Sequence, residues 1–240
     1  MAQHAAIVTG ASSGIGLSIA RMLAEEGYGI TMAARRPEKL QAAVDGLAAE
    51  GFDVHGVSAA LSEESEIQKV VAAHRERYSR LDVLVNNAGV GIGAPVGDIL
   101  TKHLDMQLSV NLRSIVIFYR ECLSMLKEAG AEHSNALVVN TSSISGKHAE
   151  AWLSVYSATK HGVVGFTEAM NKELGSAGIK STALCPAFVD TPMTDFAKGQ
   201  VAAQDMIRSE DIAESVRFLL RVSPACVVPE IMFVRPGDAL

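Results

Sequence analysis

The sequence predicts an α/β protein built on a parallel sheet with helices on both faces, and two observations carry that prediction. Short apolar segments alternate with longer segments of helical periodicity along the chain. Most of the short segments lack the polar and apolar alternation that marks a strand with one face in water. Strands that alternate with helices and bury both faces are typical of a parallel sheet covered on both sides.

The expected elements follow one another without a visible boundary. Strands are predicted at residues 5–8, 29–33, 54–58, 81–85, 137–140, 179–185 and 231–234. Helices are predicted at residues 15–26, from 37 to about 47, and at 62–78, 101–130, 156–176 and 211–220. No Pro/Ser/Gly-rich linker, charge block or repeat divides the chain, so we expect residues 1–240 to form a single domain.

Composition excludes several classes of function. The net charge is −6 and no cluster of Lys or Arg occurs, which argues against nucleic acid or an anionic membrane as a partner. Strand-like sequence begins at Ala5, which leaves no room for a signal peptide, and no apolar run approaches the roughly 18 residues of a membrane span. We therefore expect a cytoplasmic protein. Cys122, Cys185 and Cys226 are far apart and no metal-ligand spacing occurs, so reduced thiols and no metal site are expected.

A glycine-rich turn follows the first predicted strand and opens the first helix. It reads Thr9-Gly10-Ala11-Ser12-Ser13-Gly14-Ile15-Gly16. Such a turn lets the backbone approach a pyrophosphate, and the helix start offers free N–H groups and a partial positive charge. The alternative is that the glycines serve the turn geometry alone. On the first interpretation the cofactor contacts are Gly10, Ser12, Ser13, Gly14, Ile15 and Gly16.

The end of the second predicted strand distinguishes between the two nicotinamide cofactors. A dinucleotide site examines the adenosine ribose there, and an acidic residue would bind a free 2′-hydroxyl. This chain has Arg35 and Arg36 instead, and guanidinium groups suit a 2′-phosphate. We therefore predict NADP(H) over NAD(H). The alternative is that both arginines are solvated residues at a helix start.

Tyr156 and Lys160 stand four residues apart in a predicted helix, so they share one face. A phenol has a pKa of about 10 and is a poor acid or base at neutral pH. A nearby ammonium favours the phenolate and lowers that pKa, so such a pair can exchange a proton with an alcohol or alkoxide. An isolated pair of this kind is more often a partly buried tyrosine beside a solvated lysine.

Other motifs follow the ends of further predicted strands. Asn86-Asn87-Ala88-Gly89 follows residues 81–85, Ser143 follows 137–140, and Pro186 follows 179–185. In a parallel sheet these ends meet at one edge, where ligands bind. Asn111 lies in the predicted helix 101–130. Taken together with the glycine-rich turn, Tyr156-x-x-x-Lys160 and Pro186-x-x-x-x-Thr191, these motifs closely resemble the short-chain dehydrogenase/reductase family over nearly the whole chain.

The resemblance implies a doubly wound Rossmann fold with strand order 3-2-1-4-5-6-7 and a catalytic tetrad of Asn111, Ser143, Tyr156 and Lys160. In that family pattern the tyrosine is the general acid in reduction and the serine donates a hydrogen bond to the substrate oxygen. The lysine lowers the tyrosine pKa and holds the nicotinamide ribose, while the asparagine keeps a water that relays protons. Further implied cofactor contacts are Leu61, Asn87, Ala88, Gly89, Tyr156, Lys160, Pro186, Val189 and Thr191.

The chain departs from the family pattern at three places. The usual acidic residue that contacts adenine is replaced by Ala60 beside Leu61, so one hydrogen bond is expected to be lost. Ala187 replaces the usual glycine after Pro186, which restricts the nicotinamide loop. The C-terminal segment lacks the Gly-Gly ending typical of 3-oxoacyl-carrier-protein reductases, which weakens that interpretation without removing it.

The expected activity is interconversion of a small ketone or aldehyde and an alcohol with NADP(H). Two alternatives stay open: a 3-oxoacyl-carrier-protein reductase-like enzyme, and a non-catalytic dinucleotide-binding regulatory protein. A short segment, residues 192–206, suggests a small lid. Candidate substrate-facing residues are Val90, Gly91, Ile92, Ser145, His148, Trp152, Phe188, Met193 and Phe196.

The family resemblance implies a homodimer or homotetramer built on the helix at 101–130 and the helix that carries Tyr156. The helix at 101–130 carries apolar residues over more than one stripe, including Ile115, Ile117, Phe118 and Leu123, and some of that surface is predicted to lie between subunits.

Overall fold

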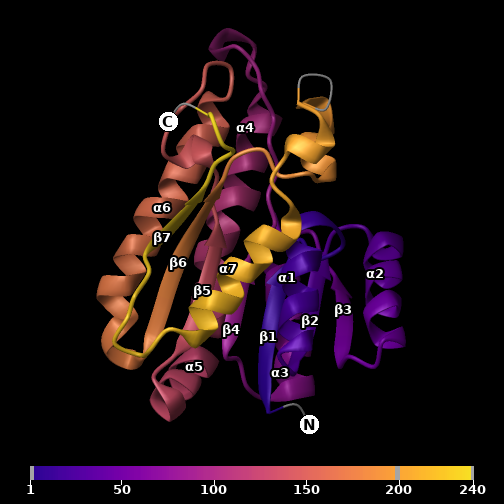
Figure 1. Cartoon of the computed structure of the whole chain (residues 1–240), viewed down its shortest axis with the longest axis vertical. Coiled ribbons are helices and arrows are strands. Elements are labelled where there is room, and N and C mark those ends of the chain that lie inside the picture. The colour runs from indigo at the N-terminus through magenta and orange to yellow at the C-terminus, as the bar shows by residue number, and fades with distance from the viewer. Residues whose placement is uncertain (1–2, 198–200, 239–240) are drawn as a thin grey trace.

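The computed structural model describes residues 3–197 and 201–238, and over these it forms a seven-stranded sheet in the order β3-β2-β1-β4-β5-β6-β7 (Figure 1). Every neighbouring pair is parallel. The strands are β1 His4–Thr9, β2 Tyr28–Ala34, β3 Val54–Ser58, β4 Val83–Asn86, β5 Ala136–Thr141, β6 Ile179–Pro186 and β7 Glu230–Phe233. The fold class and strand order expected from the sequence are confirmed.

Helices cover both faces of the sheet. They are α1 Gly14–Glu25, α2 Pro37–Ala49, α3 Glu64–Tyr78, α4 Thr101–Leu108, α5 Ser114–His133, α6 Ser154–Leu174 and α7 Ser209–Arg221. One buried cluster joins α1, α2 and α7 to the sheet, and a second joins α3, α5 and α6 to its other side. Within the described residues, no helix is long and apolar enough to cross a lipid bilayer.

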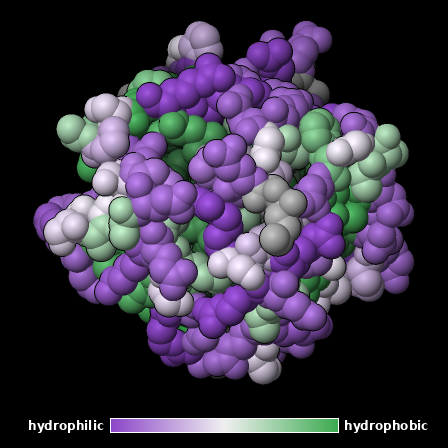
Figure 2. All heavy atoms as spheres, turned by 90° about the horizontal axis from the view of Figure 1, so that it is seen from below, coloured by the Kyte–Doolittle hydropathy of each residue, from purple (hydrophilic) through white to green (hydrophobic). Residues whose placement is uncertain are grey.

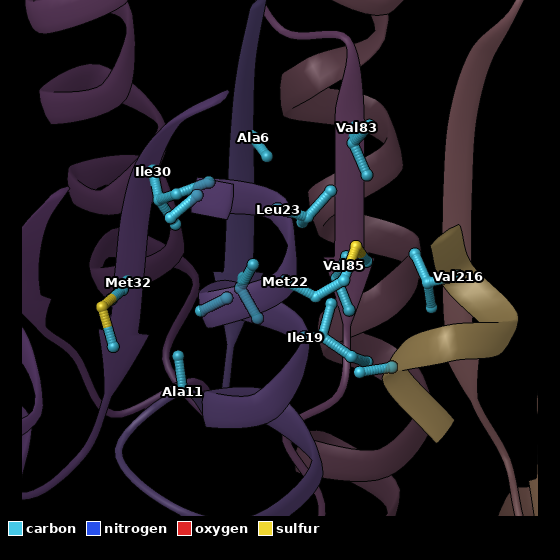
Figure 3. Packing of buried hydrophobic residues seen from close by; sticks show 14 of the residues in the cluster. Ala6, Ala11, Ile19, Met22, Leu23, Ile30, Met32, Val83, Val85 and Val216 are labelled. Carbon is cyan, nitrogen blue, oxygen red and sulfur yellow. The ribbon is translucent and has the colours of Figure 1, made fainter. Parts of the chain in front are cut away.

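Successive residues of a strand belong alternately to the two clusters, because their side chains point to opposite faces of the sheet. In β1, Ala6 and Val8 belong to the cluster under α1, whereas Ile7 belongs to the cluster under α5. Figure 3 shows the first cluster, where Ile19 of α1 and Val216 of α7 lie beside each other near β4. This double burial explains why the strands are nearly uniformly apolar in sequence.

The single helix predicted over residues 101–130 is interrupted, which corrects the sequence interpretation. Ser109–Arg113 forms one π-helical turn between α4 and α5, and α5 continues to His133. A π turn fits one extra residue into the helix, and the helical pattern of the sequence carries no clear mark of it. Such turns occur frequently at functional sites.

The apolar residues assigned to a subunit interface on this helix are mostly interior. Ile115, Ile117 and Phe118 are buried within the chain, because α5 packs against β4, β5 and β6 of the sheet and beside α3. The large apolar side chains exposed here are Met106 at 37% and Leu108 and Val116 at 42% each.

The amino-terminal edge of the sheet is fastened by Asp82, which lies just before β4. Its carboxylate is 2% exposed and accepts hydrogen bonds from the Ala5 N–H (2.8 Å), from Arg80 Nε (2.9 Å) and from Arg80 Nη2 (2.6 Å). His133 of α5 and His4 of β1 also contact it, at 3.0 and 3.3 Å. Burial alone raises the pKa of Asp82, but these hydrogen bonds, from Arg80 above all, outweigh it and lower the pKa to about 2.

His4, Asp82 and His133 lie close enough together to suggest a metal site, but their hydrogen bonds argue against one. The Asn135 N–H donates to Nδ1 of His133 at 3.2 Å, so the neutral ring carries its proton on Nε2, the atom that faces Asp82. Arg80 also occupies both carboxylate oxygens of Asp82. The cluster is therefore an anchor between β1, β4 and α5. Figure 2 views this end, which is largely hydrophilic.

Candidate active site

The glycine-rich turn between β1 and α1 leaves room for a ligand only because glycines form it. Gly10 and Gly14 have φ of 66° and 54°, in the left-handed region that favours glycine. A Cβ placed at Gly16 would lie 2.5 Å from the Gly10 carbonyl oxygen and 2.6 Å from Asn87 Nδ2. Any side chain at Gly16 would therefore push the turn apart.

The start of α1 fits the negative charge of a dinucleotide pyrophosphate. Ser13 is the N-cap, yet its side chain makes no capping hydrogen bond, and the first turn holds no acidic residue. The N–H groups of this turn and the positive end of the helix dipole are not neutralised by the chain itself. These N–H groups and the glycine-rich turn together suit the pyrophosphate that the sequence predicts at this place.

The turn after β4 is tied to the glycine-rich turn through Thr9. The Thr9 hydroxyl accepts hydrogen bonds from the Asn87 N–H (2.9 Å) and the Ala88 N–H (3.0 Å). Asn87 Nδ2 donates to the Thr9 carbonyl at 3.1 Å, and Thr141 at the end of β5 donates to Asn87 Oδ1 at 3.2 Å. The ends of β1, β4 and β5 are thus held in one arrangement at the carboxyl edge.

Tyr156 and Lys160 of α6 meet at this edge on one face of their helix, as the sequence predicts. Lys160 Nζ lies 5.6 Å from the centroid of the Tyr156 ring and donates to the Thr141 carbonyl at 2.8 Å. Lys160 is 3% exposed, and burial lowers its pKa to about 8. A Cβ at Gly89 would be 3.5 Å from Nζ, so the ammonium also lies against the turn after β4.

The pKa of Tyr156 differs from the sequence expectation. Burial raises it above the ordinary value of a phenol, the Glu150 carboxylate adds to the rise, and hydrogen bonding with Ser143 lowers it. The expected lowering by Lys160 is not found here. The reason is geometric, since the ammonium is bonded to Thr141 and lies over the ring. A phenol with a raised pKa is held protonated at neutral pH.

Asn111, in the π turn, positions the loop that follows β4. Its Nδ2 donates to the Val90 carbonyl and its Oδ1 accepts from the Val90 N–H, both at 2.8 Å. Nδ2 also contacts Thr159 Oγ1 at 3.1 Å, next to Lys160 in the chain. One turn earlier, Gln107 accepts from the Ile92 N–H at 3.1 Å. The asparagine thus connects the loop to α6, and its expected water-holding role stays a prediction.

Ser143 lies at the end of β5, and its neighbours set the direction of its hydroxyl. Ser143 Oγ accepts from the Ser145 N–H at 3.2 Å, and the hydroxyl also forms the hydrogen bond with Tyr156. Ser145, which is 3% exposed, donates from its hydroxyl to Glu150 Oε1 at 3.1 Å. The Glu150 carboxylate is therefore linked to Ser143 through two hydrogen bonds, both of which are made by Ser145.

The remaining cofactor candidates divide between the edge and the core. Arg35 and Arg36 are exposed directly after β2, at the expected place. Leu61 and Val189 have side chains buried in the two core clusters, so a contact from either residue to a cofactor would come from its backbone, and both stay predictions. Thr191 lies against the glycine-rich turn, since a Cβ at Gly14 would be 2.9 Å from Thr191 Cγ2.

The substrate candidates are less closely grouped. Trp152, His148 and Met193 are exposed, and the Trp152 ring occupies the space that a side chain at Gly93 would need. Trp152 has φ of 57°, and its carbonyl accepts from the Ala94 N–H at 2.8 Å. Gly91 lies near the Tyr156 ring, 3.7 Å from it if a Cβ is added.

Phe188 follows β6, with the Arg235 guanidinium 5.7 Å from its ring centroid. In the expected lid, two short 3₁₀ helices, Pro192–Ala197 and Ala203–Asp205, flank residues 198–200, which lie outside the described residues. The side chain of Phe196 also lies outside what is described.

Three contributors to the site were not identified from the sequence. Thr9 precedes the glycine-rich turn and was quoted only as part of that motif. Thr141 contributes its backbone carbonyl, and Glu150 stands in a loop with no recognisable pattern. Of the three, only Thr9 could have been predicted from the sequence, because a hydroxyl at the end of a strand can form hydrogen bonds with a neighbouring turn.

The profile of short chain dehydrogenases matches residues 4–201 of the chain. The chain belongs to the short-chain dehydrogenase family. This dehydrogenase is 36% identical over 219 residues to granaticin polyketide synthase putative ketoacyl reductase 1 of Streptomyces violaceoruber, covering 90% of the chain and 78% of that protein. The family assignment made from motifs is confirmed.

Solved structures agree with the fold of this dehydrogenase. A variant of actinorhodin polyketide ketoreductase with NADPH has a TM-score of 0.87 at 32% identity, covering 97% of both chains. The 3-ketoacyl-(acyl-carrier-protein) reductase of Brucella melitensis with NADH has a TM-score of 0.88 at 26% identity, covering 98% of both chains. Relatives of one fold are thus solved with either nicotinamide cofactor.

Proposed function

We propose that this dehydrogenase reduces a ketone or aldehyde to an alcohol with NADPH, with Tyr156 as the proton donor. The observation that carries the proposal is the meeting of Tyr156, Lys160 and Ser143 at the carboxyl edge, beside the glycine-rich turn. A binding protein has no need of a phenol and a buried ammonium held together at such an edge.

The residues of the chain divide the work between them. Gly10, Gly14 and Gly16 let the backbone approach the pyrophosphate, and the start of α1 attracts its charge. The bound nicotinamide supplies the hydride that reduces the carbonyl carbon. Ser143 donates a hydrogen bond to the carbonyl oxygen, and the protonated phenol of Tyr156 gives that oxygen its proton.

Lys160 serves this chemistry through its position and charge. Its buried ammonium, fixed by the Thr141 carbonyl, offers its remaining donors to the nicotinamide ribose. The raised pKa of Tyr156 suits reduction, because the phenol must be protonated to act as an acid.

The choice of NADPH is supported by Arg35 and Arg36. They are exposed directly after β2, where a dinucleotide site contacts the adenosine ribose. The acidic residue that would bind a free 2′-hydroxyl is not present at positions 35 and 36. The relative solved with NADPH agrees, whereas the Brucella melitensis relative is solved with NADH. The arginines of this chain therefore carry the argument.

A second candidate is reduction of a ketoacyl group on a carrier or thioester. It is favoured by the granaticin and actinorhodin relatives, both named as ketoacyl or polyketide ketoreductases. A panel of small ketones beside a 3-ketoacyl thioester, followed by NADPH absorbance, separates the two candidates. A kcat/KM far higher for the thioester would favour the second.

Tyr156→Phe tests catalysis itself. It removes the proton donor, so kcat should fall by about 10²-fold or more while NADPH affinity is retained. Tyr28→Phe is a matched control, because Tyr28 stacks with His4 at the opposite edge of the sheet. Unchanged turnover in Tyr156→Phe would favour the non-catalytic binding protein.

We also propose that the protein works as a homodimer or homotetramer in the cytoplasm. Leu108 and Val116 are exposed apolar side chains on adjoining helices, which supports an interface, and light scattering of the purified chain tests it. Cys122, Cys185 and Cys226 are all free thiols, as suits a reducing compartment.

A further inference from the structure

The loop of residues 147–153 presents a carboxylate beside the reacting groups. Glu150 Oε1 accepts from the Ser145 hydroxyl at 3.1 Å, and the Ser145 N–H donates to Ser143 Oγ at 3.2 Å. These two hydrogen bonds and the length of a serine place the Glu150 carboxylate at most about 10 Å from Ser143 Oγ. The Glu150 charge acts on Tyr156 as well.

This loop is held at several points, so the carboxylate has a defined place. The His148 N–H donates to the Ile144 carbonyl at 2.9 Å, and Lys147 forms an ion pair with Glu230 of β7 at 2.9 Å. The Trp152 carbonyl accepts from the Ala94 N–H at 2.8 Å. A carboxylate on a mobile surface loop would be averaged over many positions, whereas this one is anchored to a buried serine.

The carboxylate has no cationic partner among its described contacts. Lys147, the nearest lysine in the loop, is engaged by Glu230. Glu150 is bonded by the neutral hydroxyl of Ser145, with a longer contact of 3.5 Å between its N–H and Ser157 Oγ. Its negative charge is therefore not cancelled locally, and it acts on whatever occupies the substrate side of Ser143 and Tyr156.

We propose that Glu150, held by Ser145, is a specificity determinant that disfavours carbonyl substrates carrying a negative charge next to the reacting carbonyl. Neutral ketones and keto esters are accepted at their ketone carbonyl, and keto acids are rejected by repulsion between carboxylates. The inference rests on the proposed reductase function and deepens it by naming the charge class of its substrate.

The size of the effect follows from Coulomb's law. Two unit charges about 10 Å apart repel enough to change a rate constant by about 2-fold in a water-like medium and by about 20-fold at an effective dielectric constant of about 20. Glu150 is exposed, so the lower part of that range applies at high salt.

The test compares two compounds that differ in charge at the same position, ethyl acetoacetate and acetoacetate. The ratio of their kcat/KM values with NADPH is measured for the wild type and for Glu150→Gln. We expect the wild type to prefer the ester, and Glu150→Gln to narrow that preference by about 2-fold to 20-fold, mainly through the KM of acetoacetate.

Glu168→Gln is the matched control, because it also removes one exposed negative charge, about three helical turns beyond Tyr156 in α6, and leaves Lys147 paired with Glu230. It should leave the ratio near that of the wild type. A second measurement needs only the wild type. Added salt should narrow its preference for ethyl acetoacetate over acetoacetate, because salt screens the charge of Glu150.

The outcomes separate the two proposals. An unchanged ratio in Glu150→Gln, or an equal change in Glu168→Gln, would overturn the role of Glu150 while leaving the reductase intact. Failure of all three proteins to reduce either compound would count against the reductase, and the role of Glu150 would fall with it.

Discussion

Removal of the charge of Asp82 should weaken the fold in a way that depends on pH. In the folded chain the hydrogen bonds of Asp82, from Arg80 above all, bring its pKa from 3.8 to about 2. That difference corresponds to about 2 kcal/mol in the free energy of unfolding at neutral pH. Asp82→Asn keeps the shape of the side chain but forfeits this contribution, and it leaves Arg80 with Glu132, at 3.3 Å, as its remaining described charged acceptor.

The sign of the pH dependence follows from the lowered pKa. The contribution of Asp82 is fully present above the pKa of the unfolded state and is lost as the pH falls through about 4 to 2. The stability difference between the wild type and Asp82→Asn should therefore be largest near pH 7 and shrink by about 2 kcal/mol by pH 2.

Urea unfolding followed by far-ultraviolet circular dichroism at pH 7, 5, 4 and 3 measures this difference. Protein concentration is kept constant, because an oligomer would make stability depend on it. Other carboxylates titrate in both proteins, so they cancel when the two curves are subtracted. A difference that stays constant between pH 7 and 3 would refute the account of Asp82 as a charged anchor.

Three further predictions concern the site. Replacement of Arg35 and Arg36 by alanine should weaken NADPH binding by about 10-fold or more and NADH binding little, and equal losses in a fluorescence titration would contradict the assignment of the 2′-phosphate site. Gly16→Ala should lower NADPH affinity at least 10-fold because its methyl group meets a carbonyl oxygen at 2.5 Å; an unchanged Kd would show that the turn can yield. Because burial, with the charge of Glu150, raises the pKa of Tyr156, alcohol oxidation needs a higher pH than reduction; Glu150→Gln should move the rising limb of the oxidation profile to lower pH, and a limb that stays in place or moves upward would count against this.

The fold was predictable because the information lies in local pattern. The strands are short apolar runs that bury both faces, and glycine at positions 10, 14 and 16 marks the turn that follows β1. The lysine and tyrosine of α6 were placed correctly because helical spacing fixes which residues share a face.

What escaped prediction depends on contacts between segments far apart in sequence. The direction of the Lys160 ammonium is set by the Thr141 carbonyl, and Glu150 reaches the site through a hydroxyl on another loop. The burial of Ile115 was missed because the apolar residues of this helix cover more than one stripe, and packing against the sheet and α3 decides which of them are interior. None of these has a local signature in the amino-acid order.

The π turn at Ser109–Arg113 also constrains which lengths this helix can have in evolution. Deleting one residue there would restore a regular α-helix with α4 and α5 in nearly the same rotation, but the wider turn that carries Asn111 would be lost. Asn111 would then leave the Val90 N–H and carbonyl that it bonds, and the substitution of any single side chain could not restore both contacts. The helix can therefore exchange residues freely at many surface positions while its residue count between Gln107 and Asn111 stays fixed.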